Sequence, residues 1–159
     1  MPNPYAPYTD STEIVSNYLY TQLLANMASF TDGAGHTVQM VWYGDESGLI
    51  PKYPAVCVVP GPERSEYQGT GGRPVVMNFQ TFLMVYAGEL LRDHQLNVHS
   101  SLSIANSIKR FVHQDITLGG MAIDCLCTGI DPGVAVRGGA MIDTTRMVFR
   151  TRSKVVLNP

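Results

Sequence analysis

The stretch PVVMNFQTFLMVYA, residues 74–87, alternates between two side-chain faces along its whole length and therefore predicts a long β-strand. The face expected to meet the core carries Val75, Met77, Phe79, Thr81, Leu83 and Val85. The opposite face carries Val76, Asn78, Gln80, Phe82, Met84 and Tyr86. Since this second face becomes apolar toward its carboxyl end, we expect another part of the protein to cover it there.

A second helix and two more strands are expected after this central strand. Apolar residues recur at helical spacing in the first segment, and Gly119 and Gly120 turn the chain after it. The expected elements are a helix over residues 94–113 with residue 90 as an alternative start, a strand over residues 121–130, turns over residues 131–139 and a final strand over Ala140–Val156.

A first helix and two short strands are expected before the central strand. Val15, Leu19, Leu23 and Met27 recur every four residues and predict an amphipathic helix. The helix is expected to start at Asp10 and Glu13, with Thr9 as the alternative cap, and to end at Gly33 and Gly35. Strands are expected over residues 37–43 and 55–59, with a loop over residues 44–53.

Residues 61–73, GPERSEYQGTGGR, combine turn formers with charges and predict a long loop. We expect residues 61–72 to be mobile in the free protein and to become ordered on docking. A phosphate-binding loop is disfavoured because these glycines lead into a strand, whereas a phosphate cradle leads into a helix N-terminus. The expected contact groups of the loop are Glu63, Arg64, Glu66 and Tyr67.

These elements predict one α+β domain over residues 10–156, since strands on both sides of a packed helix indicate a sheet with helices on one face. We expect a mostly antiparallel sheet with an N-terminal helix and a second helix packed on that face. The proline-rich residues 1–9 are expected to form a flexible arm, and residues 157–159 a tail.

The composition argues against several classes of protein. Hydrophobic residues make up 45% of the 159 residues, which excludes intrinsic disorder. A net charge of −2 argues against a nucleic-acid binder, and no apolar run reaches the length of about 20 residues that spans a membrane. Cys57, Cys125 and Cys127 form no disulfide framework, so we expect reduced, buried thiols and assembly in a cytosol.

No catalytic, cofactor-binding or metal-binding signature is present in the sequence. Cys125 and Cys127 could supply two zinc ligands, but buried free cysteines are the more common arrangement in a sheet. The spacing of His94, His99 and His113 places no tight pair on one helical face. We therefore expect no enzymatic activity, no cofactor and no metal.

Charge is distributed unevenly along the chain. Residues 1–51 contain five acidic residues and no Lys or Arg, whereas residues 137–159 contain five basic residues and one acidic residue. A solvated surface without further role is one interpretation. The functional alternative is head-to-tail self-association, in which the acidic end of one copy meets the basic end of the next.

Basic residues alternate onto one face of the final strand, opposite Met147, Phe149 and Val155. A solvated sheet face is again one interpretation, and a contact between subunits or the lining of a ring is the other. We expect a protein interface here, with apolar contacts near Phe82, Met84 and Tyr86 providing most of the binding free energy. The basic residues of this face are Arg146, Arg150, Arg152 and Lys154.

The order of these segments resembles the tail terminator proteins of long-tailed bacteriophages. The similarity covers most of residues 10–156 and is one of pattern, size and element order, which other neck and tail-completion proteins of phages share in part. The proline-rich arm and residues 37–43 lie outside the shared pattern. The segments that carry it are the N-terminal helix, the strand opening YPAV at 53–56, the polar loop at 61–72, NFQTFLMVYA at 78–87, IKRFV at 108–112 and MVFRTRSK at 147–154.

The resemblance implies a non-enzymatic virion protein that is assembled in the host cytoplasm and lies at the head-proximal end of the tail. Such proteins form a homo-hexameric ring that caps the tail tube, stops its polymerisation and offers the head-joining surface. The implied partners are further copies of the chain, the tail tube protein and a head-completion or connector protein. DNA only passes through the lumen, and no membrane is involved.

Two other functions remain open at this point. A head-side connector or neck protein would share the ring and differ in its docking partner. A small cytosolic α+β ligand-binding or enzymatic domain would instead show a closed pocket with convergent polar groups.

Overall fold

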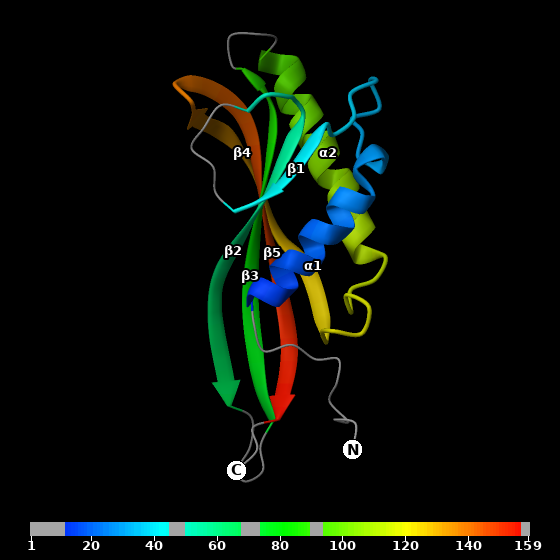
Figure 1. Cartoon of the computed structure of the whole chain (residues 1–159), viewed down its shortest axis with the longest axis vertical. Helices are drawn as coiled ribbons and strands as arrows, with labels where there is room; N and C mark the ends of the chain where they lie inside the picture. The colour runs from blue at the N-terminus through cyan, green and yellow to red at the C-terminus, as the bar shows by residue number, and fades with distance from the viewer. Residues whose placement is uncertain (1–11, 45–49, 68–73, 90–93, 157–159) are drawn as a thin grey trace.

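The computed structural model describes residues 12–44, 50–67, 74–89 and 94–156 (Figure 1). The predicted arm at residues 1–9 and the predicted tail at 157–159 lie outside these ranges. The helices are α1 (Thr12–Ala25), the short 3-10 helix η1 (Met27–Ser29) and α2 (His94–His113). The strands are β1 (Met40–Tyr43), β2 (Ala55–Tyr67), β3 (Pro74–Glu89), β4 (Asp124–Arg137) and β5 (Ala140–Val156).

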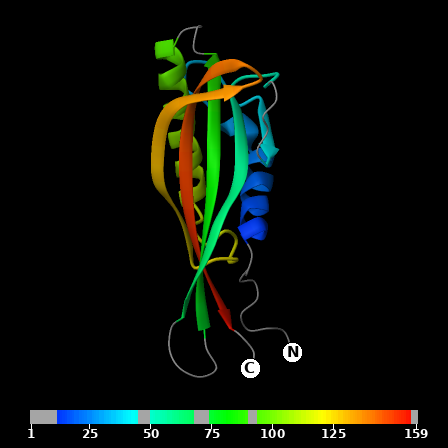
Figure 2. The same cartoon turned by 90° about the vertical axis from the view of Figure 1, so that its left-hand side faces the viewer.

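The five strands form one sheet in the order β1-β2-β3-β5-β4. β1 pairs with β2 in parallel, and every other neighbouring pair is antiparallel. Both α-helices lie on the same side of this sheet (Figure 2). The predicted α+β fold is therefore confirmed. Within the described part of the chain, no helix is long and apolar enough to cross a membrane.

The main core lies between the helices and the sheet. The predicted inner face of β3 is confirmed for Phe79, Thr81, Leu83 and Val85, which are buried. Met77 is half-buried, and the side chain of Val75 lies outside the described part of the structure. The buried strand residues meet apolar side chains from both helices and from β5. The helix and β5 residues of this core include Val15, Leu19 and Leu23 of α1, Ile104, Ala105, Ile108 and Val112 of α2, and Met147 and Phe149 of β5.

A second, smaller core lies on the opposite face of the sheet, near the carboxyl end of β3. The Trp42 ring stacks on Tyr86 with 5.7 Å between ring centroids. Ala135 and Ala140, at the closed end of the β4–β5 hairpin, pack against this cluster. The predicted cover over the apolar end of this β3 face is therefore present. The buried residues of the cluster are Trp42, Ile50, Ala55, Cys57, Tyr86 and Ile142.

The first helix is shorter than predicted, because α1 ends at Ala25 and not near Gly33. Asn26 leaves the helical conformation and its side-chain amide donates to the Gln22 carbonyl at 2.8 Å, which satisfies an end group of the last turn. The strand predicted over residues 37–43 is confirmed only for Met40–Tyr43.

Residues 61–67 are strand, so the prediction of a loop from residue 61 was wrong for this part. Pro60 and Gly61 lie at a β-bulge, where the register with β3 shifts between Pro60 and Glu63. The bulge takes up the irregular residues, and regular pairing with β3 then resumes as far as Tyr67.

Residues 131–137 are also strand, which corrects the prediction of turns over 131–139. β4 is an edge strand, where a proline such as Pro132 is tolerated because the missing N–H can face away from the partner strand. The turn is limited to Gly138 and Gly139, whose φ angles of 57° and 80° favour glycine in a two-residue hairpin. β4 also begins at Asp124, three residues after the predicted start.

Candidate functional site

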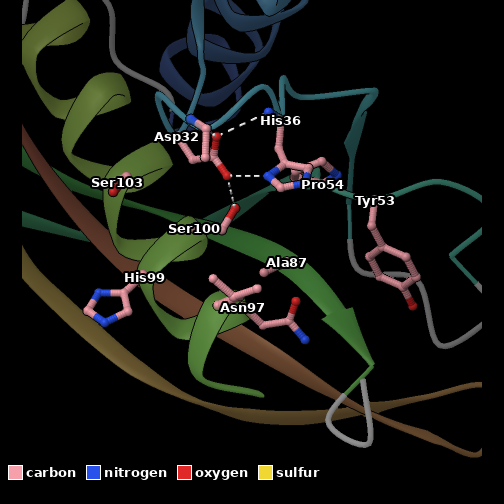
Figure 3. Close-up of a pocket in the computed structure, with 11 residues that line it drawn as sticks. Asp32, His36, Tyr53, Pro54, Ala87, Asn97, His99, Ser100 and Ser103 are labelled. Carbon is pink, nitrogen blue, oxygen red and sulfur yellow. Dashed lines mark hydrogen bonds and ion pairs between the residues drawn. The ribbon is translucent and has the colours of Figure 1, made fainter. Parts of the chain in front are cut away.

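One candidate site is a cavity of about 300 Å³ beside α2 (Figure 3). It lies between this helix, the loop that follows η1 and the residues that lead into β2. Its polar lining comes from Asp32, His36, Tyr53, Asn97, His99, Ser100 and Ser103.

The carboxylate of Asp32 organises this cavity. Its side chain is 4% exposed, and it accepts hydrogen bonds from the Ser100 hydroxyl at 2.9 Å and from His36 Nδ1 at 2.6 Å. The backbone N–H groups of Ala34 and His36 donate to the same carboxylate. Burial raises the pKa of Asp32, but these hydrogen bonds together lower it to about 2.

Aspartate, histidine and serine are the residue types of a hydrolytic triad, but their arrangement here differs from one. In a triad the imidazole lies between the hydroxyl and the carboxylate. Here both Ser100 Oγ and His36 Nδ1 contact the same oxygen, Oδ2 of Asp32. The imidazole therefore does not lie between the hydroxyl and the carboxylate, and the cluster joins the loop after η1 to α2.

A second candidate site is the helix-free face of the sheet, by which we mean the face opposite α1 and α2. Arg146, Arg150 and Arg152 lie in alternate positions of β5, and their surroundings differ. The Arg152 guanidinium forms an ion pair with Asp124 and donates from Nε to both carboxylate oxygens at 3.0 Å. These bonds lower the pKa of Asp124.

The other two arginines of this row have different neighbours. The Arg146 guanidinium lies over the Phe82 ring at 4.5 Å, a cation–π contact. Arg150 is exposed and lines a cavity of about 260 Å³ together with Pro62, Arg64, Asn78 and Gln80. The row therefore contains one guanidinium in an ion pair, one over an aromatic ring and one that lines a cavity, and Arg146 and Arg150 are both exposed.

The three apolar residues predicted for an interface are not equally accessible. Phe82 and Met84 are half-buried on the helix-free face. Tyr86 is fully buried inside the protein, and its hydroxyl accepts hydrogen bonds from Arg137 at 2.8 and 3.2 Å. Tyr86 is therefore not exposed for a partner in this structure, because the end of the β4–β5 hairpin covers it.

The four residues predicted for a docking loop also differ in their surroundings. The Glu63 carboxylate accepts a hydrogen bond from the Thr12 backbone N–H at 2.6 Å, so it caps the start of α1. Arg64 is exposed in β2. Glu66 and Tyr67 also belong to β2, while their side chains and residues 68–72 lie outside the described part of the structure.

The cysteines and histidines are placed apart. The thiols of Cys57 and Cys125 are buried and form no disulfide, and burial raises the pKa of Cys125 to about 11. The Cys127 backbone N–H donates to His113 Nε2 at 3.0 Å, and His94 Nδ1 contacts the buried Asp143 carboxylate at 2.8 Å. Among the described residues, no three His, Cys, Asp or Glu side chains are grouped to hold a metal ion.

Sequence reasoning missed the Asp32 cluster and the role of Glu63. Asp32 and Ser100 are 68 residues apart, and Thr12 and Glu63 are 51 apart, so no local spacing indicates either contact. No family model matches the chain, and no curated protein matches it.

Proposed function

We propose that this protein is a structural subunit of a phage virion, a tail terminator that forms a ring of identical copies. The ring caps the tail tube, stops its polymerisation and presents the surface to which the head is joined. Its partners are the tail tube protein and a head-completion or connector protein, and DNA passes through the lumen.

The proposal rests on one observation. The helix-free face of the sheet is exposed, and several strands of the sheet are longer than the helices that cover its other face. β2, β3 and β5 continue past the ends of both α-helices (Figures 1 and 2). The helix-free face combines half-buried Phe82 and Met84 with the exposed Arg64 and Arg150. A surface with an apolar centre and a polar rim is typical of a protein interface.

The charges of the chain favour a contact between unlike surfaces. Residues 1–51 are acidic and β5 is basic, so two copies fit better head to tail than face to face with the same patch. Such a heterologous contact forms a closed ring when the rotation between neighbouring copies brings the last copy back to the first. Because exposed ion pairs contribute only about 0–1 kcal/mol each, Phe82 and Met84 provide most of the stabilisation.

The element order adds the second line of support, through its resemblance to the tail terminator family. The geometry of the Asp32 cluster also favours a non-enzymatic role, because its hydroxyl bonds to the carboxylate and not to the imidazole.

The test is tube assembly with the tail tube protein from the same genome. We expect that added protein stops tube growth and that electron microscopy shows a ring at one end of each tube. Bovine serum albumin at equal concentration serves as the control. Tubes that grow to the same length with and without the protein would contradict the proposal. Binding to head connectors but not to tubes would indicate the head-side alternative.

A small-ligand-binding domain is the second candidate, and the Asp32 cavity favours it. Its volume of about 300 Å³ is at the lower end for small-molecule pockets. A thermal-shift screen with small amines and sugars tests it, with Asp32→Asn as the comparison. A ligand whose stabilising effect disappears in that variant would support this candidate.

A further inference from the structure

We infer that the cavity between Arg64 and Arg150 is a carboxylate-binding site, which receives an acidic side chain from a second copy of this chain. The inference rests on the proposed ring and names one contact that would hold it together.

The strand register brings the two arginines to opposite sides of β3. Arg64 of β2 pairs with Asn78, and Arg150 of β5 pairs with Gln80. Neighbouring strands are about 4.8 Å apart, so the two backbones are separated by about 10 Å. Two long side chains can close on one bound group across that gap, above the amides of Asn78 and Gln80 that line the same cavity.

The chemistry of the lining selects an anion. Two guanidinium groups and two amides supply N–H donors, and no carboxylate lines the cavity within the described residues. Arg152 already binds Asp124 and Arg146 already lies over Phe82, so neither competes for the same ligand. A carboxylate fits because it accepts paired hydrogen bonds from a guanidinium and offsets the repulsion between two like charges.

We expect side chains on the face to make the contact, because parts of both edge strands are interrupted. On one edge, β2 extends beyond β1 through Pro60, a bulge and Pro62. On the other edge, β4 contains Pro132 and a bulge between Cys127 and Gly129. Prolines and bulges block the continuous hydrogen bonding that an added strand needs.

The occupant is a second copy because this chain itself carries acidic residues. Asp32 is buried and already bound to Ser100 and His36, whereas Glu13 is exposed on α1. Residues 1–51 contain five acidic residues and no Lys or Arg, whereas residues 137–159 contain five basic residues and one acidic residue. DNA is a poorer match, since binding to phosphates grows with the number of charges neutralised and the whole chain has a net charge of −2.

The experiment compares charge reversals by sedimentation velocity of the full chain at low and high salt. Arg150→Glu and Arg64→Glu, alone and together, are matched with Arg110→Glu, which makes the same change at an exposed position in the last turn of α2. Each variant is first checked for folding by circular dichroism and thermal unfolding. Arg150→Lys keeps the charge but removes the paired donors.

We expect the wild type to self-associate and each reversal in the cavity to weaken association about tenfold, whereas Arg110→Glu changes it less than about twofold. Arg150→Lys should fall between the wild type and Arg150→Glu. A heterologous contact uses two different surfaces, and the double variant loses only one of them. Its acidic surface should therefore still bind the cavity of a wild-type copy, and no further copy should then add to the altered cavity of the variant.

Three outcomes would overturn the inference. They are a wild type that stays monomeric at every concentration, a double variant that associates like the wild type, and salt-sensitive DNA binding that disappears in Arg150→Glu. The tube assay separates this inference from the proposed function. If the wild type caps tubes and the variants associate normally, the proposed ring stands and this site is rejected. If the variants lose association but the wild type caps no tubes, this site stands and the tail terminator function is rejected.

Discussion

Gly61 shows how one residue decides whether two strands can pair. A Cβ atom at this position would lie 2.7 Å from the Gln80 carbonyl oxygen and 2.9 Å from Cε2 of Phe82. These distances are shorter than normal contacts, and the first involves backbone that cannot turn away. The requirement for glycine at the bulge of β2 is therefore one of space.

We predict that Gly61→Ala lowers the free energy of unfolding by about 1–3 kcal/mol, the usual cost of overpacking. Gly133→Ala is the matched control, because nothing lies within 4 Å of a Cβ there. Its effect should stay within about 0.5 kcal/mol. Urea unfolding of both variants measures the difference, and equal stabilities would show that the bulge can relax.

Asp32 makes the stability of the protein depend on acid. Its folded pKa of about 2 lies below the value of about 3.9 in an unfolded chain, so its contribution is present above that unfolded value and is lost as the pH falls toward 2. We predict that Asp32→Asn costs about 1–2 kcal/mol at neutral pH and flattens the acid limb of the stability curve.

Thermal unfolding between pH 2 and pH 7 measures this effect, with the exposed Asp131→Asn as the control. If the Asp32→Asn variant loses stability on acidification as steeply as the wild type, the acid sensitivity comes from other carboxylates.

At the scale of elements, two buried hydrogen bonds between hydroxyl groups connect the helices to the sheet. Ser16 of α1 contacts Thr81 of β3 at 2.8 Å, and Ser101 of α2 contacts Thr145 of β5 at 2.8 Å. All four residues are buried, so each hydroxyl depends on protein partners for its hydrogen bonds.

We predict that Ser16→Ala and Thr81→Val each cost about 1–3 kcal/mol, because each leaves the partner hydroxyl buried without this bond. The double variant should be less destabilised than the sum of the two. A double-mutant cycle in urea gives the coupling, with the exposed Ser103→Ala as a check on the Ser-to-Ala change itself. If the destabilisations of the two single variants add without any coupling, the hydrogen bond between Ser16 and Thr81 contributes nothing to stability.

Regular patterns made the long elements predictable. The bounds of α2 and β5 match their predictions, and β3 extends only two residues past its predicted end, because each repeats its apolar spacing over many residues. Local reasoning failed where proline and glycine occur inside strands, at Gly61 and Pro132. A bulge and an edge position accommodate these residues, and both features depend on the neighbouring strand.

The sites were less predictable than the elements. Period two correctly placed Arg146, Arg150 and Arg152 on one face, but it could not indicate that Asp124 binds one of them. It also could not indicate that Tyr86 is covered, because the covering residues come from a hairpin more than 45 residues further along the chain. Such contacts depend on topology, which local spacing does not determine.

At the scale of the whole molecule, the sheet separates two apolar clusters. One lies between the sheet and the helices, and the smaller one lies on the helix-free face around Trp42 and Tyr86. Ile104 belongs to the first cluster and Ile142 to the second, and both are fully buried.

We predict that Ile104→Val and Ile142→Val each cost about 1 kcal/mol and that their effects add within about 0.5 kcal/mol. The control pair is Ile104→Val with Ile108→Val, which share one cluster and one helix face and should depart from additivity. Urea unfolding measures both pairs. Coupling between Ile104 and Ile142 as strong as in the control pair would mean that the two clusters behave as one.

The central position of β5 affects how the protein folds while the ribosome is making it. β5 lies between β3 and β4, although it follows both in the sequence. A nascent chain can pair β2 with β3 early, but the strand that joins β3 to β4 has not yet been translated. One edge of β3 therefore stays unpaired until residues 140–156 have been made, and we expect chains stalled before residue 140 to remain protease-sensitive and to engage chaperones.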